Sequence, residues 1–392
     1  MKLAHLADLH LGFRQFHRQT SSGLNQREAD VANAFRAAVD GVIAERPDAV
    51  LLAGDIFHSV RPSNPSILFA FRELARLREA LPEAPVILIA GNHDTPRSTE
   101  TGSILALFSS LGVDVVADQA RRLSYPALDL AVLAVPHPAL VGPERVSLGP
   151  DGSERHQVLM LHGEVEGLFS ADRSSVEYGG ALLPPAELAG AGWSYVALGH
   201  YHVQTEVAPR VWYSGALEYV STNPWGELVE ERKRRLSGKG WLLVTLPEGR
   251  VERRPIAAAR RVLDLEPVDG RDKTAAELDA AIAARLDAVP GGIAGQIVRL
   301  VVRNVPRQIG RELDHAAIRA RKTEALHFQL DLTRPEDQRE TGVGAPGHRQ
   351  TLPQIVEAYL SRRLLPGEID RDAFVRRGVA LIEAVEQDEA EA

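Results

Sequence analysis

The sequence predicts an α/β protein, because short apolar runs alternate with segments of helical periodicity. Each apolar run ends in Gly, Asn, Asp or His, and the runs are KLAHLADLH (2–10), AVLLAGD (49–55), VILIAGNHD (86–94), VLMLHG (158–163) and YVALGHYH (195–202). Short apolar runs closed by such residues indicate buried strands. Apolar residues at helical spacing predict helices over 26–46, 65–81 and 102–111.

The second half of the chain predicts smaller units. Residues 247–249 (Pro-Glu-Gly) indicate a hairpin turn between two strands. A strand at 262–265, a helix at 274–286 and a strand at 297–303 indicate a small α/β domain. We therefore expect the following divisions: a first domain over 1–258, a second over 259–333, a linker over 334–350, and a C-terminal region over 351–392 with helices at 352–364 and 370–387.

Composition excludes several kinds of site. The chain has 392 residues and no cysteine, which rules out a disulfide framework, a thiolate zinc site, an iron–sulfur cluster and a cysteine nucleophile. We expect a cytoplasmic protein, because the N-terminus lacks an apolar signal segment and no apolar run approaches the roughly 20 residues of a membrane span. The net charge is −8, yet residues 232–261 hold ten Lys and Arg against two Glu. That stretch is either a contact for phosphates or a solvated basic face.

Polar residues at the strand ends form a candidate metal site; they are Asp8, His10, Asp55, Asn92, His93, Asp94, His162, His200 and His202. In α/β sheets, ligands bind at the carboxyl ends of the strands. Imidazole and carboxylate donors suit Mn²⁺, Fe²⁺ or Zn²⁺. Six or seven such ligands exceed one tetrahedral site and suit two metals about 3.5–4 Å apart that share a carboxylate.

The ordered set D-x-H, GD, GNHD, H and GHxH resembles the signature of the calcineurin-like metallophosphoesterases. Within them the chain looks most like the SbcD-like exonucleases, the nuclease subunits of double-strand-break repair complexes. The resemblance runs through HLADLHLGFRQFHR, the Arg27, Asp30 and Phe35 pattern and GDIFH, which contains His58. The chain departs from the family at SGALEY (214–219), where many members carry a Pro-Gly-Ser turn, and at position 58, where some members have Asp.

The resemblance implies a metallophosphoesterase β-sandwich flanked by helices, a small α/β cap domain and C-terminal helices. It implies two divalent metal ions, which we expect to be Mn²⁺. One ion would be held by Asp8, His10, Asp55 and His202, and the other by Asp55, Asn92, His162 and His200. The resemblance gives catalytic roles to three further residues: His93 would assist the leaving oxygen, His58 would steer the sugar-phosphate, and Asp94 would either fix the His93 ring or cap the turn.

The resemblance also implies partners. We expect a homodimer that cleaves duplex DNA as an exonuclease and endonuclease together with an SMC-like ABC ATPase of the SbcC type. The chain lacks a G-x-x-x-x-G-K-[ST] loop, so ATP dependence would come from that partner. The candidate DNA contacts are Arg232, Lys233, Arg234, Arg235 and Lys239.

Three alternatives remain open. The chain could instead be a metallophosphoesterase acting on small phosphate esters, cyclic nucleotides or phosphoproteins, since such an enzyme shares every metal ligand. It could also be a DNA-binding scaffold for the ATPase. The C-terminal helices dock either to the ATPase or back on the chain's own cap domain.

Overall fold

The computed structural model describes residues 1–96, 102–143, 146–168, 181–189, 192–335, 351–362 and 370–391. The chain divides into two compact units, residues 1–333 and 334–392. Apart from residues 334 and 335, the expected linker over 334–350 lies outside the described residues.

Two sheets form the core of the first unit. Within the described residues the first sheet runs β14 (Arg250–Pro255), β13 (Gly240–Thr245), β1 (Lys2–Leu6), β2 (Ala49–Ala53), β3 (Val86–Ile89) and β4 (Asp114–Val116). The second runs β11 (Thr205–Ala208), β12 (Val211–Tyr213), β10 (Tyr195–Gly199), β7 (His156–His162), β6 (Leu130–Val135) and β5 (Arg121–Tyr125). The strands β1 to β4 are mutually parallel, as are β6, β7, β10 and β12. The predicted α/β sandwich is confirmed.

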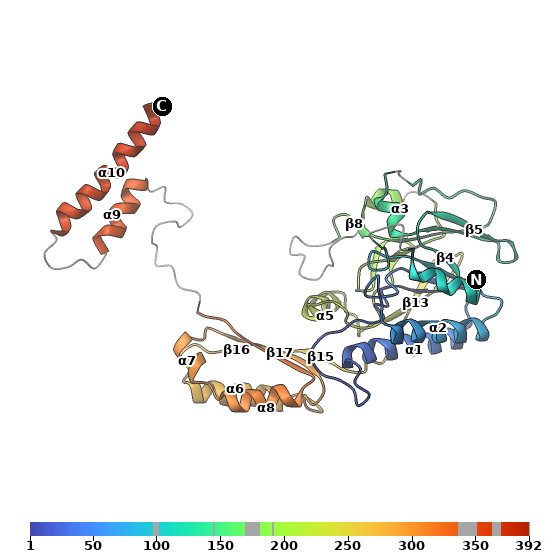
Figure 1. Cartoon of the computed structure of the whole chain (residues 1–392), viewed down its shortest axis with the longest axis horizontal. Coiled ribbons are helices and arrows are strands. Elements are labelled where there is room, and N and C mark those ends of the chain that lie inside the picture. Colours follow the sequence, from blue (N-terminus) through green and yellow to red (C-terminus); the bar gives the residue numbers. More distant parts are fainter. Residues whose placement is uncertain are drawn as a thin grey trace. The chain divides into compact units, whose positions relative to one another are not determined.

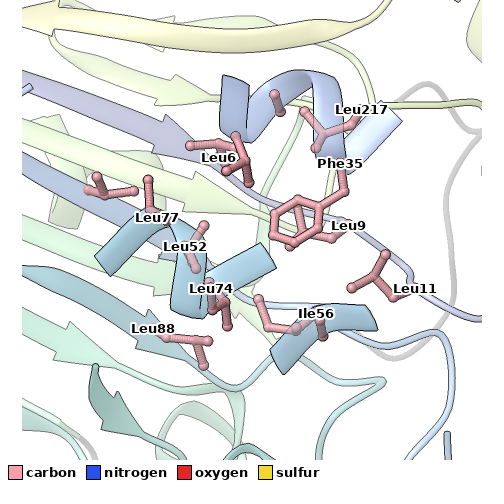
Figure 2. Close-up of a cluster of buried hydrophobic side chains, with 14 of the residues drawn as sticks. Leu6, Leu9, Leu11, Phe35, Leu52, Ile56, Leu74, Leu77, Leu88 and Leu217 are labelled. Carbon is pink, nitrogen blue, oxygen red and sulfur yellow. The ribbon is translucent and has the colours of Figure 1, made fainter. Parts of the chain in front are cut away.

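Strand side chains alternate between two hydrophobic clusters, as the two-residue period of a strand requires. In β2, for example, Leu51 packs between the sheets whereas Leu52 packs under the helices. Both faces of the central parallel strands are therefore covered, which explains why these strands are continuous apolar runs in the sequence. Figure 2 shows the cluster under the helices, where Phe35 meets Leu6 and Leu9.

Two helices, α1 (Gln26–Glu45) and α2 (Asn64–Ala80), cover one outer face of the sandwich (Figure 1). The Asn25 side chain caps α1 by accepting from two backbone amides, and Ser63 caps α2 with a proline in its first turn. The third predicted helix is shorter and tighter: Ile104–Leu111 is a 3₁₀ helix, η2. Other short elements are η3 (Pro126–Leu128), α3 (His137–Val141), α4 (Pro185–Ala189) and the pair β8 (Glu164–Val165) and β9 (Leu182–Leu183).

The hairpin and the small α/β region also form as predicted, with β13 and β14 flanking the expected turn. A third sheet contains β15 (Val262–Asp264), β16 (Val268–Asp269), β17 (Ile297–Arg303) and β18 (His327–Leu332). It carries α6 (Ala275–Asp287), α7 (Arg307–Glu312) and α8 (His315–Glu324). A helix that the sequence did not predict, α5 (Pro224–Lys233), packs against β15, so it lies between the sandwich and this third sheet (Figure 1).

The second unit contains two helices within its described residues, α9 (Leu352–Arg362) and α10 (Arg371–Glu391). They pack closely on each other, because a Cβ atom at Gly378 would lie 2.2 Å from Cδ1 of Leu360. Both predicted C-terminal helices are confirmed. Among the described residues, no helix combines the length and the hydropathy that a membrane crossing would require.

Candidate metal centre

The strands that carry the candidate ligands end in left-handed backbone. Asp8 and His10 follow β1, Asp55 follows β2 and His200 follows β10, and their φ angles are 54°, 45°, 52° and 109°. Such angles are costly in residues other than glycine and persist mainly where the surrounding structure enforces them, often at functional sites. Backbone hydrogen bonds do so here: the Asp8 amide donates to Gly54 and the His10 amide to Asp55.

Two glycines allow the strand ends to approach one another. A Cβ atom at Gly199 would lie 1.9 Å from the Ala53 carbonyl oxygen, and one at Gly91 would lie 2.1 Å from Oδ1 of Asp55. A side chain at Gly199 would push the two sheets apart, and one at Gly91 would displace Asp55 at the end of the first sheet. The glycines of the GNHD and GHxH segments are thus steric requirements of the site.

The first ligand group contains Asp8, His10 and His202, all buried, with one donor atom from each within 4.8 Å of the others. The Nε2 atoms of His10 and His202 are 3.1 Å apart. Asp8 accepts the His200 amide through Oδ1 at 2.9 Å, while its Oδ2 is buried and has no hydrogen-bond partner among the described residues. Burial raises the pKa of Asp8 to about 6, an effect that the neighbouring His162 and His202 oppose.

The second group contains Asp55, His162 and His200 under the same distance limit, and Asn92 joins it. Oδ1 of Asn92 lies 3.0 Å from Nε2 of His162 and 3.2 Å from Nδ1 of His200. The Ala53 carbonyl lies 2.9 Å from Nδ1 of His162. A carbonyl only accepts, so Nδ1 carries the proton and Nε2 presents its lone pair to the centre.

Asp55 connects the two groups through a single oxygen. Its Oδ2 is 3.6 Å from Nε2 of His10 and 3.3 Å from Nε2 of His162, while its Oδ1 accepts the His93 amide at 2.9 Å. Burial alone would raise the pKa of Asp55, but His162 and His10 bring it well below its usual range. Oδ2 of Asp55 therefore lies close to a histidine nitrogen of each ligand group.

This donor set fits two divalent cations. The buried Oδ2 atoms of Asp8 and Asp55 have no hydrogen-bond donor among the described residues. The lone pairs of Oδ2 of Asp55 and Nε2 of His162 face each other at 3.3 Å, which is repulsive unless a cation or a proton lies between them. Burial lowers the pKa of His162, but the Asp55 and Asp8 carboxylates bring it to about 9. A metal ion would displace that proton.

The residues expected to act on the substrate lie beside the first group, and they are more exposed than Asp8, His10 and His202. His93 and His58 are half-buried, and donor atoms of His10, His58 and His93 lie within 4.8 Å of one another. The His58 carbonyl oxygen is 2.8 Å from Nδ1 of His93, so Nδ1 carries a proton and exchange with a substrate would run through Nε2.

The sequence left two roles open for Asp94, fixing the His93 ring or capping the turn, and the hydrogen bonds favour capping. It is buried, and its carboxylate accepts the backbone amides of Ile56 at 3.0 Å, Phe57 at 2.9 Å and Gly91 at 3.1 Å. Burial, with a smaller contribution from Asp55, raises its pKa to about 7. Asp94 thereby fastens the loop after β2 to the loop after β3.

The residues of the basic stretch differ in exposure. Arg232, Lys233 and Arg235 are exposed, whereas Arg234 is half-buried, and both Lys233 and Arg234 pair with Glu230. Lys239 does not fit the expected role in DNA binding, because it is buried and its ammonium binds two carboxylates and a carbonyl. From one sequence, a buried paired cation is indistinguishable from an exposed one.

Sequence reasoning also missed Glu227, a fully buried acid on α5 whose Oε1 is 3.4 Å from Nδ1 of the ligand His202. Burial would raise the pKa of Glu227, but Lys239 and His202 bring it to about 2. The available signal was Pro224 followed by an acid in the first turn and bases in the last turn, which is typical of a helix.

Comparison with known proteins adds named relatives. Residues 1–204 match the family model described as calcineurin-like phosphoesterase. The chain is 30% identical over 211 residues to the DNA double-strand break repair protein Mre11 of Sulfurisphaera tokodaii, covering 52% of this chain and 49% of the relative. The protein of the same name from Methanocaldococcus jannaschii is 26% identical over 254 residues, covering 62% of each chain. That from Methanococcus maripaludis is 37% identical over 111 residues, or 28% of each chain.

The chain thus spans about half the length of the first of these curated relatives. A solved structure, a dimetal phosphatase from Danio rerio, matches 64% of this chain and 94% of its own with 12% identity and a TM-score of 0.35, which is too low to carry an argument. The match to the family model is more extensive. It spans more than half of the 392 residues and contains every candidate metal ligand from Asp8 to His202. The chain belongs to the calcineurin-like phosphoesterase family.

Proposed function

We propose that this chain is a two-metal DNA exonuclease and endonuclease, which hydrolyses phosphodiester bonds during double-strand-break repair in the cytoplasm. The observation that carries the proposal is the pair of buried ligand groups joined by Oδ2 of Asp55 beside two half-buried histidines. The choice of DNA as substrate is supported by the relatives, which are named as DNA double-strand break repair proteins.

In this proposal Asp8, His10, Asp55 and His202 would hold one divalent ion, and Asp55, Asn92, His162 and His200 the other, with Mn²⁺ as the expected metal. When bound, such a pair supplies a water nucleophile at neutral pH and charge stabilisation for an in-line displacement at phosphorus. The cradle is buried except at Asn92, and the adjacent His93 and His58 are half-exposed at its side. The substrate phosphate would therefore approach on the side of these two histidines.

His93 has the chemistry of a positioned acid. Its Nδ1 proton is held by the His58 carbonyl, which fixes the ring, and a second proton on Nε2 would go to the leaving oxygen. General acid catalysis of this kind contributes roughly 10²- to 10⁴-fold to a rate. His58 has its Nδ1 3.2 Å from Nδ1 of His10 and its ring stacked on His93, a place from which it would contact the sugar-phosphate next to the scissile bond.

The partners also belong to the proposal. Exposed Arg232, Lys233 and Arg235 would contact the DNA backbone without reading its sequence. The chain would dimerise through α2 and η2, which expose Leu68 and Leu107. The helices α9 and α10 would bind the SMC-like ATPase, since they expose four large apolar side chains: Leu352, Tyr359, Phe374 and Leu381. The third sheet and its helices would act as a cap over 259–333, separate from the nuclease domain over 1–258.

The test is cleavage of end-labelled linear duplex DNA with Mn²⁺, alongside a small chromogenic phosphodiester. We expect progressive shortening of the duplex by the wild-type chain, with or without added ATPase. The variant His93→Ala should keep its metal ions and lose roughly 10²- to 10⁴-fold in rate. If small diesters are hydrolysed rapidly while every duplex remains intact, even with the ATPase present, the chain is a small-substrate esterase and the nuclease proposal is wrong.

A further inference from the structure

A buried carboxylate lies behind one of the candidate metal ligands. Glu227, on α5, is fully buried, and its Oε1 is 3.4 Å from Nδ1 of His202. The same oxygen accepts the backbone amide of Ser221 at 3.1 Å. The other oxygen, Oε2, accepts from the ammonium of Lys239. Both oxygens are therefore engaged, and the orientation of the carboxylate toward the ring is fixed.

The contact between Glu227 and His202 determines which ring nitrogen of His202 carries the proton. An ionised carboxylate only accepts hydrogen bonds, so the proton of the neutral ring is placed on Nδ1 and the lone pair on Nε2. Nε2 is the atom that lies 3.1 Å from Nε2 of His10, within the first ligand group. A carboxylate paired with Nδ1–H also makes the imidazole a stronger donor to a metal ion.

The other ligand group is supported differently. The Nδ1 of His162 faces the Ala53 carbonyl at 2.9 Å, which is a neutral backbone group and belongs to the same sandwich. The Nδ1 of His202 faces a charged side chain that belongs to a helix outside both sheets. His162 and His202 therefore differ in the charge behind the ring, and the charge behind His202 comes from α5.

Lys239 and Glu231 complete the arrangement. The Lys239 ammonium binds both carboxylates and donates to the His202 carbonyl at 2.9 Å, so the backbone and the ring of His202 are held by one network. The Tyr219 hydroxyl donates to Glu231 at 2.6 Å. Breaking a buried charge network is costly when one partner is left uncompensated, and this makes Lys239 part of the scaffold. Glu231 shares the network and the burial of Glu227, but its carboxylate contacts Lys239 and Tyr219 rather than His202.

We propose that Glu227 is a positioning residue for His202, and that it sets the affinity of the Asp8, His10 and His202 group for its metal ion without equal effect on the second group. This inference rests on the proposed metal centre. Glu227 would act through His202 rather than on the substrate. Its pairing with Lys239 keeps the carboxylate in place when no ion is bound.

The test is a titration of the full chain with Mn²⁺. Calorimetry measures the affinity of each ion, and electron paramagnetic resonance distinguishes a coupled ion pair from a single ion. In Glu227→Gln we expect one of the two ions to bind roughly 10- to 100-fold more weakly, as for other outer partners of metal-bound histidines. The second ion should keep its wild-type affinity, and the coupled signal should give way to a single-ion signal at limiting Mn²⁺.

Glu231→Gln is the matched control, because it removes a buried charge from the same network. It should lower the melting temperature and leave both affinities unchanged. If Glu227→Gln does not fold, Glu227→Asp retains the charge and should weaken the same ion by a smaller factor.

Unchanged binding of both ions in the Glu227 variant, or equal weakening of one ion in both variants, would overturn the inference. A wild-type chain that binds no Mn²⁺ would instead overturn the proposed metal centre, and the inference would fall with it.

Discussion

Single atoms decide what the residues of the centre can do. Asp55 uses Oδ2 for both ligand groups and Oδ1 for the His93 amide, so one carboxylate fixes the bridge and the adjacent catalytic candidate together. His93 in turn has its proton placed on Nδ1 by a carbonyl. The chemistry expected of each residue thus depends on an individual neighbour that the sequence alone does not reveal.

Asp94→Asn tests the turn-capping role. The carboxylate accepts three backbone amides, and an amide side chain would place its NH₂ group against at least one of them. We expect the free energy of unfolding to fall by about 2 kcal/mol, the cost of a buried donor left without an acceptor. Urea unfolding measures this change. The exposed Asp118→Asn is the control; an equally small effect in both variants would show that Asp94 does not hold the loops together.

At the scale of elements, the ends of the strands carry the site and the sequence predicted them well. Each apolar run formed a strand, and because the strands are parallel within each sheet, their closing polar residues lie at the same end of that sheet. The helix α5 was not predicted, because its acids and bases have the pattern of a solvated face. In the structure two of its acids are internal: Glu227 and Glu231 are buried and both pair with Lys239, which lies beyond the end of the helix.

The same reason explains the wrong expectation for Lys239. Burial depends on tertiary packing, and a cation with two internal counter-ions has no distinguishing neighbour along the chain. The 3₁₀ form of η2 could not be predicted from the sequence either, since apolar spacing over eight residues fits both an α-helix and a 3₁₀ helix. The sequence predicted which polar side chains would meet, but not which buried partners would contact them.

Gly91→Ala tests the close approach of the strand ends. The added methyl group would lie 2.1 Å from Oδ1 and 2.4 Å from the backbone nitrogen of Asp55, so Asp55 must move. Because Asp55 would hold both metal ions in the proposed centre, we expect both ions to bind at least roughly 10-fold more weakly. Calorimetric titration measures the loss. Gly149→Ala, where the nearest atom is 4.0 Å away, is the matched control; wild-type affinity at Gly91→Ala would refute the steric account.

At the scale of the whole molecule, stability should depend on pH through a buried histidine. His5 is fully buried in β1, where burial lowers its pKa from 6.5 to about 3. Its Nδ1 lies 3.0 Å from the Tyr195 hydroxyl, which joins the two sheets. The folded state therefore excludes a proton that the unfolded chain binds, and the stability present above pH 6.5 is lost as the pH falls toward 3.

His5→Gln should flatten this dependence. Between pH 6.5 and 3, we expect the free energy of unfolding to fall by up to about 4 kcal/mol more in the wild type than in the variant. Denaturant unfolding at a series of pH values measures the difference in slope, with the exposed His17→Gln as the control. Parallel curves for the wild type and His5→Gln would contradict the role of His5.

The central claim is a centre for two metal ions that shares Oδ2 of Asp55, and anomalous diffraction from Mn²⁺-soaked crystals of the full chain tests it most directly. The account predicts two manganese peaks about 3.5–4 Å apart on either side of Asp55. One should contact Asp8, His10 and His202, and the other Asn92, His162 and His200. A single peak, or two peaks that do not share Asp55, would contradict the account.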